Sequence, residues 1–240
     1  MWKAVVVVVC LGFVMTGYAE PSEETALSAR ALQFFAQVED ANFDAYLKRV
    51  RLPPVAPEFR TQVLARLPQI EIVSPSRAMS ARLASLTPLL QYHKRQAALD
   101  IRIVNTPQAL VSVQGRAVLL LSENIFRVLR VEELQAVVAH ELGHEYFWGE
   151  LMEARQQKNY DRMRELELRC DGIAVIALER LGIDATHLIS ALASMRAFNA
   201  RVGATDAMPY PRERERVAFI RAMRQLAQTR AINGRVSARK

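Results

Sequence analysis

The residues best suited to chemistry run from His140 to His144, in the order His-Glu-Leu-Gly-His. Residues four apart lie on one face of an α-helix, with Cβ atoms about 5–6 Å apart, so His140 and His144 can bind one metal ion through imidazole nitrogens. Glu141 lies one step round the helix, where its carboxylate can reach a water molecule at the ion without binding the ion itself. Zinc sites that carry out hydrolysis use three protein ligands and leave the fourth position to water. One further ligand is therefore required.

The third ligand is not a histidine of the longer pattern H-E-x-x-H-x-x-G-x-x-H, because positions 147 and 150 hold Phe147 and Glu150. The other histidines are His93 and His187, and neither has neighbours that favour a metal site. We expect both to be ordinary surface or partly buried residues.

A carboxylate is the remaining choice. Glu167 and Asp171 are four residues apart on an expected helix and share a face. Glu167 can bind zinc, and Asp171 can accept a hydrogen bond from a ligand histidine, which fixes the tautomer of the ring. Glu165 is a rival ligand, although Arg169 four residues later favours a surface ion pair for it. This second motif argues against a chance match of the histidine pair on a charged helix.

The elements that must position these residues change in type along the chain. The first part is mostly helix-compatible, from Glu23 to Val50 and from Glu58 to Arg66, with a brief extended piece at Ile70 to Val73 and a helical stretch at Ser80 to Ala98. Three β-prone runs follow, with a hairpin-type turn at Gln114-Gly115-Arg116 between the last two. These runs are Leu99 to Val104, Ala109 to Val113 and Ala117 to Leu121.

The rest of the chain is predicted to be helical, with Ser122 as the N-cap of the first helix. The expected helices are Ser122 to Val128, Glu132 to Phe147, Glu150 to Leu181, Asp184 to Phe198 and Arg212 to Thr229. The predicted fold class is therefore α+β and predominantly helical. A small three-stranded sheet precedes the H-E-x-x-H helix, which packs on a second ligand-bearing helix.

The N-terminus is typical of an export signal, with Lys3, a short apolar run and small residues before position 20. The apolar run is shorter than the roughly 20 residues of a membrane span, so we expect a cleaved signal, with an uncleaved tether as the alternative. The predicted organisation is a signal peptide at 1–19, a helical segment at 20–76 and a metal-binding domain at 77–240. Cys170 is then the only cysteine, which excludes an intramolecular disulfide.

The net charge is +7, and the basic excess lies late in the chain. Such a surface could meet anionic lipid, nucleic acid or an acidic protein. No aromatic platform or nucleic-acid motif accompanies it, so we favour a solvated helix face and expect no nucleic-acid partner. The residues are Arg212, Arg214, Arg216, Arg221, Arg224, Arg230, Arg235, Arg239 and Lys240.

The two motifs together resemble the gluzincin zinc metallopeptidases of the HtpX and CAAX-prenyl-protease (Oma-like) type. That family usually shows H-E-x-x-H and later E-x-x-A-D, matched here by His140 to His144 and by Glu167 to Asp171. The run from Val104 to Leu129 also resembles the segment before the family's zinc helix. Cys170 stands where the family usually has alanine, and we expect it to be a small buried packing residue.

Family members also place a T-H-P element and then an arginine after the ligand helices. The matching stretch here is Met208-Pro209-Tyr210-Pro211, with Arg216 in the arginine position. Tyr210 replaces the family histidine. It could donate a hydrogen bond to a developing oxyanion, as could Arg216, or it could be a packed loop aromatic.

The resemblance implies a zinc-dependent metalloendopeptidase with one Zn2+ per chain and Glu141 as general base. It also implies a polypeptide substrate bound in extended form along a sheet edge, with Ala109 to Val113 as that edge. With the export signal, we expect a periplasmic protein of envelope quality control that makes transient membrane-surface contact. The alternatives are a zinc-bound, weakly active chaperone-like module, which Tyr210 motivates, and a helical protein without metal. The segment 20–76 is expected to act as an autoinhibitory cap.

Overall fold

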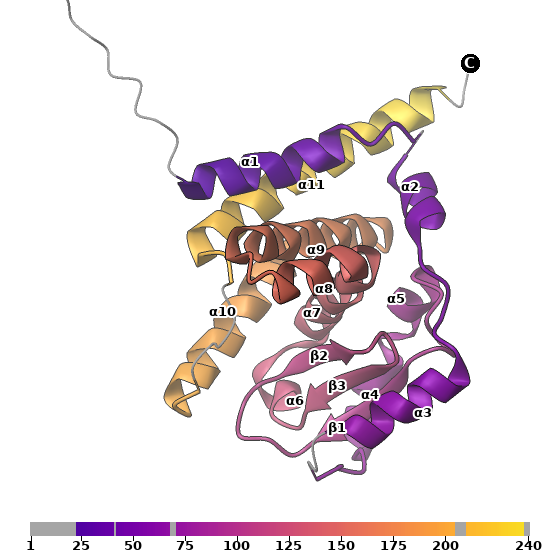
Figure 1. Ribbon diagram of the computed structural model, residues 1–240, viewed down its shortest axis with the longest axis vertical. Coiled ribbons are helices and arrows are strands. Elements are labelled where there is room, and N and C mark those ends of the chain that lie inside the picture. The colour runs from indigo at the N-terminus through magenta and orange to yellow at the C-terminus, as the bar shows by residue number, and fades with distance from the viewer. Residues whose placement is uncertain (1–22, 41, 68–70, 205–209, 238–240) are drawn as a thin grey trace, which may run out of the picture.

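The small sheet is present and is mixed. The computed structural model describes residues 23–40, 42–67, 71–204 and 210–237 (Figure 1). Its strands are β1 (Asp100–Val104), β2 (Val111–Gln114) and β3 (Val118–Ser122), in the order β1-β3-β2. β1 pairs parallel to β3, and β2 pairs antiparallel to it. The three-stranded sheet and the α+β, mostly helical class are confirmed, and β2 is an edge strand.

The hairpin between β2 and β3 forms where the glycine predicts it. Gly115 and Arg116 have φ values of 56° and 57°, and Ala117 N donates to Gln114 O at 2.9 Å. Positive φ at both central residues is the signature of a type I′ turn, whose twist matches that of the flanking strands. Each residue of β3 is buried, which fits a central strand.

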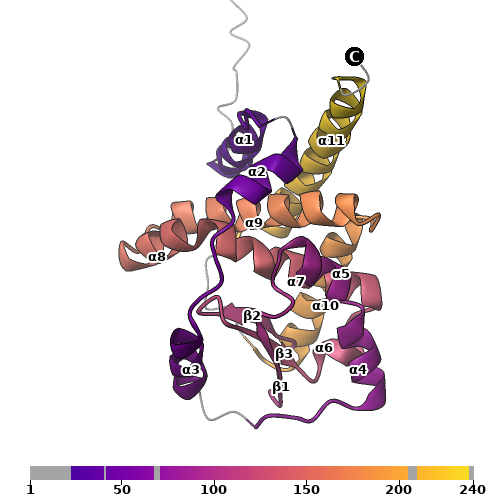
Figure 2. The ribbon, with the colours of Figure 1, turned by 90° about the vertical axis from the view of Figure 1, so that its right-hand side faces the viewer.

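Two of the helical stretches expected before the sheet are divided, Glu23 to Val50 into α1 and α2 and Ser80 to Ala98 into α4 and α5, whereas Glu58 to Arg66 forms the single helix α3. Figure 2 shows α3 at the level of the sheet, where Val63 and Leu64 pack against Val118 and Leu120. The bounds are α1 (Glu23–Ala36), α2 (Phe43–Val50), α3 (Pro57–Arg66), α4 (Arg77–Ala84) and α5 (Thr87–Tyr92).

The helices after the sheet build most of the molecule. The bounds are α6 (Ile125–Val128), α7 (Val131–Gly143), the 3-10 helix η1 (His144–Phe147), α8 (Trp148–Gln156), α9 (Tyr160–Arg180), α10 (Thr186–Arg201) and α11 (Glu213–Ser237). Among the described residues, no helix is both long enough and apolar enough to cross a membrane. The predicted signal peptide lies outside the described residues.

Three sequence predictions about these helices are wrong in detail. The expected helix from Glu132 to Phe147 ends as an α-helix at Gly143, and His144 to Phe147 form the 3-10 helix η1. The expected helix from Glu150 to Leu181 is divided at Lys158, which has a φ of 52°, and α9 starts afresh after Asn159, whose side chain accepts from Arg162 N at 3.0 Å. Ser122 is not an N-cap. It ends β3, where its N donates to Leu110 O, and Asn124 precedes α6 instead.

The core is continuous from α1 to α11. α7 and α1 lie on different sides of α9, and α11 runs beside α1 (Figures 1 and 2). Phe35 of α1 is fully buried against Gly172 of α9, where a Cβ would come within 2.3 Å of the Phe35 ring. Leu27 and Ala31 are buried in the same cluster. α1 is therefore part of the core, and its packing lends no support to a detachable cap. The predicted boundary at residue 77 stays a prediction.

Candidate metal centre

The site depends on an unusually close approach of two helices. At Gly143, near the end of α7, an added Cβ would lie 2.9 Å from the carbonyl oxygen and 3.1 Å from the Cβ of Cys170 on α9. The absence of a side chain at Gly143, opposite the small Cys170, therefore lets the two backbones meet. This contact brings the H-E-x-x-H residues opposite the Glu167 to Asp171 segment.

The histidines and the glutamate of α7 and η1 form a compact group. One ligand atom from each of His140, Glu141 and His144 lies within 4.8 Å of the other two, so the group could hold a metal ion. The two imidazole rings are 5.0 Å apart between centroids and nearly perpendicular, at 85°. His140 is buried, whereas His144 and Glu141 are partly accessible.

Glu167 of α9 completes the convergence. Its Oε2 lies 3.3 Å from His140 Nε2, and its Oε1 lies 3.7 Å from His144 Nε2. Glu167 is 4% exposed, and its Oε2 is buried with no hydrogen-bond partner among the described residues. Buried carboxylate oxygens are normally hydrogen-bonded. This atom has instead a long ion pair with His140 Nε2, which a metal ion shared by the two side chains could replace. Zinc held tetrahedrally at about 2.0–2.1 Å would separate its ligand atoms by about 3.3 Å, which these residues fit.

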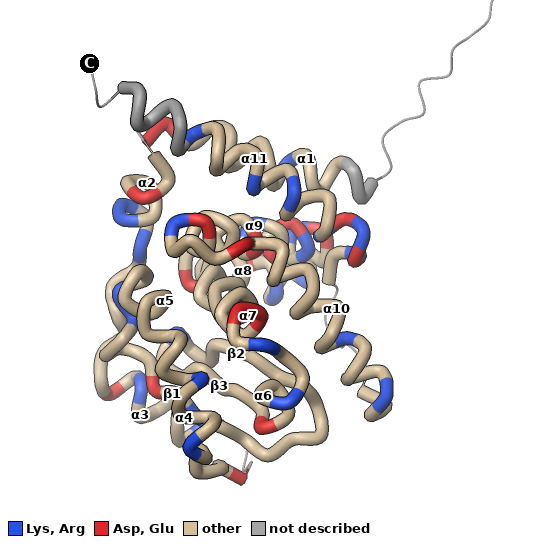
Figure 3. The backbone as a smooth tube through the Cα atoms, turned by 180° about the vertical axis from the view of Figure 1, so that it is seen from behind, with Lys and Arg blue, Asp and Glu red and all other residues tan. Residues whose placement is uncertain are grey.

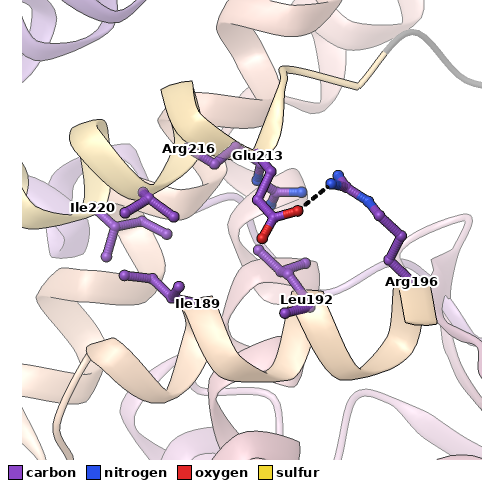
Figure 4. A pocket seen from close by; sticks show the side chains of 8 residues that line it. Ile189, Leu192, Arg196, Glu213, Arg216 and Ile220 are labelled. Atoms are coloured by element: carbon purple, nitrogen blue, oxygen red, sulfur yellow. Dashed lines mark hydrogen bonds and ion pairs between the residues drawn. The ribbon is translucent and has the colours of Figure 1, made fainter. Parts of the chain in front are cut away.

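A chain of buried polar contacts extends away from His140. Its Nδ1 lies 2.8 Å from Asp171 Oδ1, and Arg216 Nε of α11 donates to Asp171 Oδ2 at 2.8 Å. Asp171 is fully buried and Arg216 is 6% exposed. Figure 4 shows Arg216 from the other side, in a small apolar pocket between α10 and α11 whose Glu213 pairs with Arg196. Three helices thus fix the orientation of one imidazole.

The charges of this cluster support one another. Burial opposes ionisation of Glu167, but the charges of His144 and His140 outweigh it and lower the pKa of Glu167 to about 2. Burial also opposes the charged form of His140, yet Asp171 raises the pKa of His140 to about 9. Asp171 itself is buried, and Arg216 keeps its pKa below the ordinary value. Without a metal, His140 therefore carries a proton between two carboxylates.

Glu141 has a different environment. Its Oε2 accepts a hydrogen bond from Val113 N of β2 at 3.2 Å. Burial raises the pKa of this carboxyl above its ordinary value. The hydrogen bond connects the H-E-x-x-H helix directly to the edge strand. No feature of the sequence predicted it, because it depends on how α7 packs against β2.

Cys170 contacts the second histidine. Its Sγ lies 3.3 Å from His144 Nδ1, and burial raises the pKa of the thiol well above its usual range. The residue is fully buried. Its small volume and its neutral form fit the expected packing role.

The other candidates are Glu165 and Tyr210. Burial opposes the charge of Arg216, but Tyr210 lies close enough to that guanidinium to raise its pKa. Glu165 is buried in ion pairs with Arg162 and Arg169, at 2.8 Å and 2.6 Å, so its pairing is internal and not on the surface. Tyr210 lies just before α11 and is 41% exposed. Met208 and Pro209 of the same stretch lie outside the described residues.

The two remaining histidines are not part of the group that could hold a metal ion. His93 is buried, with Nδ1 2.9 Å from the Tyr146 hydroxyl, and His187 belongs to α10.

The late basic residues are only partly a solvated face. Arg216 pairs with Asp171, Arg224 pairs with Glu179 at 2.9 Å, and the Arg230 guanidinium donates to two carbonyl groups at the end of α1. Basic and acidic positions are interspersed over the helices (Figure 3). Much of the C-terminal charge therefore stabilises the packing of α11.

No protein-family model matches the chain, and no curated protein sequence matches it.

Proposed function

We propose that this protein is a zinc-dependent metalloendopeptidase, similar to gluzincins of the HtpX and CAAX-prenyl-protease type. The observation that carries the proposal is the convergence of the buried Glu167 carboxylate on two imidazoles. Its Oε2 lies 3.3 Å from His140 Nε2, and its Oε1 lies 3.7 Å from His144 Nε2. Imidazole nitrogens and a carboxylate are ligands that zinc prefers, and catalytic sites use three of them. We assign His140, His144 and Glu167 as those ligands.

A divalent ion bound there would act as a Lewis acid that acidifies a water molecule and polarises a peptide carbonyl group. Glu141 is assigned as the general base, because it adjoins both histidines and is partly accessible. Its carboxylate accepts the proton of the attacking water and passes it to the leaving amine. The pKa of Glu141, raised by burial, favours this exchange near neutral pH.

Asp171 and Arg216 support the site and do not touch the substrate in this proposal. Asp171 accepts the Nδ1 proton of His140, which directs Nε2 toward Glu167. Arg216 is committed to Asp171 and buried, so we assign it a positioning role and leave oxyanion stabilisation to Tyr210.

The substrate is proposed to be an extended polypeptide, because the site adjoins a sheet edge. β2 is an edge strand, and the carboxylate of Glu141 bonds to its Val113. A peptide added to that edge would present a scissile bond beside Glu141. Because the N-terminus is typical of an export signal, we further propose that the protein acts in envelope quality control in the periplasm. There it would make transient contact with the membrane surface.

The competing function is a zinc-bound, chaperone-like module that cleaves poorly. Two features of Tyr210 favour this module. The residue stands where the family has a histidine, and it is 41% exposed. The two functions differ in whether bound polypeptide is cut.

The deciding experiment uses full-length protein loaded with zinc and unfolded casein as substrate. We expect cleavage by the wild type, and a loss of at least about 100-fold in Glu141→Gln with zinc content unchanged. Retained zinc with no cleavage by the wild type would support the binding module. Cleavage that survives in both Glu141→Gln and His140→Ala would overturn the site assignment.

A further inference from the structure

The outer edge of β2 is open over a short stretch only. Ser122 N of β3 donates to Leu110 O at 2.9 Å, so the backbone groups of Leu110 face β3. Since these groups alternate in direction along a strand, the N–H and C=O of Ala109, Val111 and Val113 face away from β3. An added polypeptide strand could pair with these groups.

Asn199, near the end of α10, already occupies the first of these positions. Its Oδ1 accepts from Ala109 N at 2.7 Å, and its Nδ2 donates to Ala109 O at 3.1 Å. A side-chain amide offers one donor and one acceptor, as a peptide group does. Asn199 therefore takes the place of one residue of an added strand.

The helix that carries Asn199 is firmly held. Leu188 and Ala191 of α10 are fully buried, and Arg196 pairs with Glu213 of α11 at 2.6 Å (Figure 4). The amide of Asn199 thus belongs to a packed element and not to a loose surface side chain.

Val111 and Val113 provide the unpaired part of the edge, although their side chains are buried in the core. In the part of the chain that the structure describes, no side chain or loop backbone bonds to the N–H or C=O of Val111 or to the C=O of Val113. The N–H of Val113 bonds to Glu141. The opposite edge, on β1, is covered at its Ile103–Val104 end by residues 71–73, because Val73 N donates to Ile103 O at 2.9 Å.

We propose that Asn199 determines how much of an extended polypeptide this edge can bind, by ending the pairing at Ala109. The inference deepens the proposed function and rests on it for the position of the scissile bond beside Glu141. From Val113 to Ala109 the strand extends by four residues, or about 13 Å. On the side of the scissile bond that runs from Val113 toward Ala109, substrate residues beyond that distance leave the sheet. They gain no backbone hydrogen bonds.

The test measures the affinity of zinc-loaded Glu141→Gln protein for fluorescein-labelled casein-derived peptides of four to ten residues. We expect affinity to increase with length and then to stop increasing. Adding Asn199→Ala frees both groups of Ala109, so the longest peptides should bind at least about fivefold more tightly while the shortest are unaffected. Asn199→Asp withdraws only the donor to Ala109 O and should give a smaller gain.

Ser194→Ala, on the same helix, is the matched control and should leave the length profile unchanged. Two results would overturn the inference. One is an identical length profile with and without Asn199→Ala, and the other is an equal loss of affinity at every peptide length in both Asn199 variants. Casein cleavage by the wild type is scored separately. If casein is not cut but peptides still show the Asn199-dependent length limit, the proteolytic function fails and the role of Asn199 stands.

Discussion

At the scale of single residues, the site depends on one buried carboxylate that pairs with two imidazoles. The sequence predicted that Glu167 would meet His140 and His144, because E-x-x-x-D and H-E-x-x-H each place two side chains on one helix face. Their burial, and the lack of a hydrogen bond to Glu167 Oε2 among the described residues, became evident only in the fold. The same is true of the Glu141 contact with Val113, since no local pattern relates residues so far apart in the chain.

Metal binding should release a proton from His140. Asp171 raises the pKa of this imidazole to about 9 against the effect of burial, so His140 is protonated at neutral pH before an ion binds. Because the proton must leave, the apparent zinc affinity should fall about tenfold for each pH unit below 9. Calorimetry in buffers of different ionisation enthalpy measures the protons released.

Asp171→Asn is the corresponding variant. It should release fewer protons on binding and should bind zinc about 10- to 100-fold more weakly. Equal proton release in the variant and the wild type would contradict the assigned role of Asp171.

Cys170 should not bind the ion. Its thiol is buried, and the pKa is raised well above the usual range, so a thiolate ligand is disfavoured. Cys170→Ala should therefore leave the zinc content unchanged, as measured by elemental analysis after dialysis. A stoichiometric loss of zinc would identify the sulfur as a ligand.

At the scale of elements, the contact between α7 and α9 sets the separation of the ligands. Gly143→Ala would place a Cβ within 2.9 Å of the Cys170 carbonyl oxygen, so one helix must shift. We expect a stability loss of about 1–3 kcal/mol and weaker zinc binding. Chemical denaturation and a zinc titration measure the two effects.

Gly149→Ala is the matched control, because a Cβ there has nothing within 4 Å and the residue lies in α8. It should be neutral or stabilising by about 0.5–1 kcal/mol. If both alanine variants behave alike, close helix approach is not what positions the ligands.

The sequence predicted the type of most elements but not how the longest helix divides. Apolar spacing indicated helix on both sides of Lys158, and neither glycine nor proline marks the break. The left-handed backbone of Lys158 and the cap at Asn159 became evident only in the fold. Similarly, the sequence offers Leu27 and Phe35 as apolar residues available for burial, but it does not show that α1 packs on α9. Its buried face depends on Gly172 of α9, which is far away in the chain.

At the scale of the whole molecule, α1 should be needed for stability. Phe35 is fully buried against α9, so Phe35→Ala should cost about 3–5 kcal/mol of unfolding free energy. Removal of residues up to 36 should lower the melting temperature without raising proteolytic activity. A truncated chain that remains folded and is more active would restore the autoinhibitory interpretation of segment 20–76.

Acid should destabilise the protein through His93, a buried histidine that bonds to Tyr146 and is not one of the proposed ligands. Burial and then the charges of Arg51 and Arg95 lower the pKa of His93 to about 3 in the folded state. The unfolded chain has the ordinary value of about 6.5, so between these values only the unfolded state binds the proton. The contribution of neutral His93 to the free energy of unfolding is therefore complete above a pH of about 6.5 and is lost as the pH falls toward 3.

Thermal unfolding in EDTA from pH 7.5 to 5 tests this prediction without the contribution of metal. His93→Gln should show a shallower fall in melting temperature than the wild type, whereas His187→Gln should follow the wild type. Parallel curves for all three proteins would mean that the burial of His93 does not drive the acid response.

The covering of β1 by residues 71–73 has a consequence for self-association. A β-fibril can only lengthen indefinitely when each copy exposes two free sheet edges, one for the copy above and one for the copy below. Here one edge is already paired within the chain at Ile103 and Val104. Copies that met through Val111 and Val113 would therefore leave only a short stretch of β1 for a further copy, which disfavours growth into a filament.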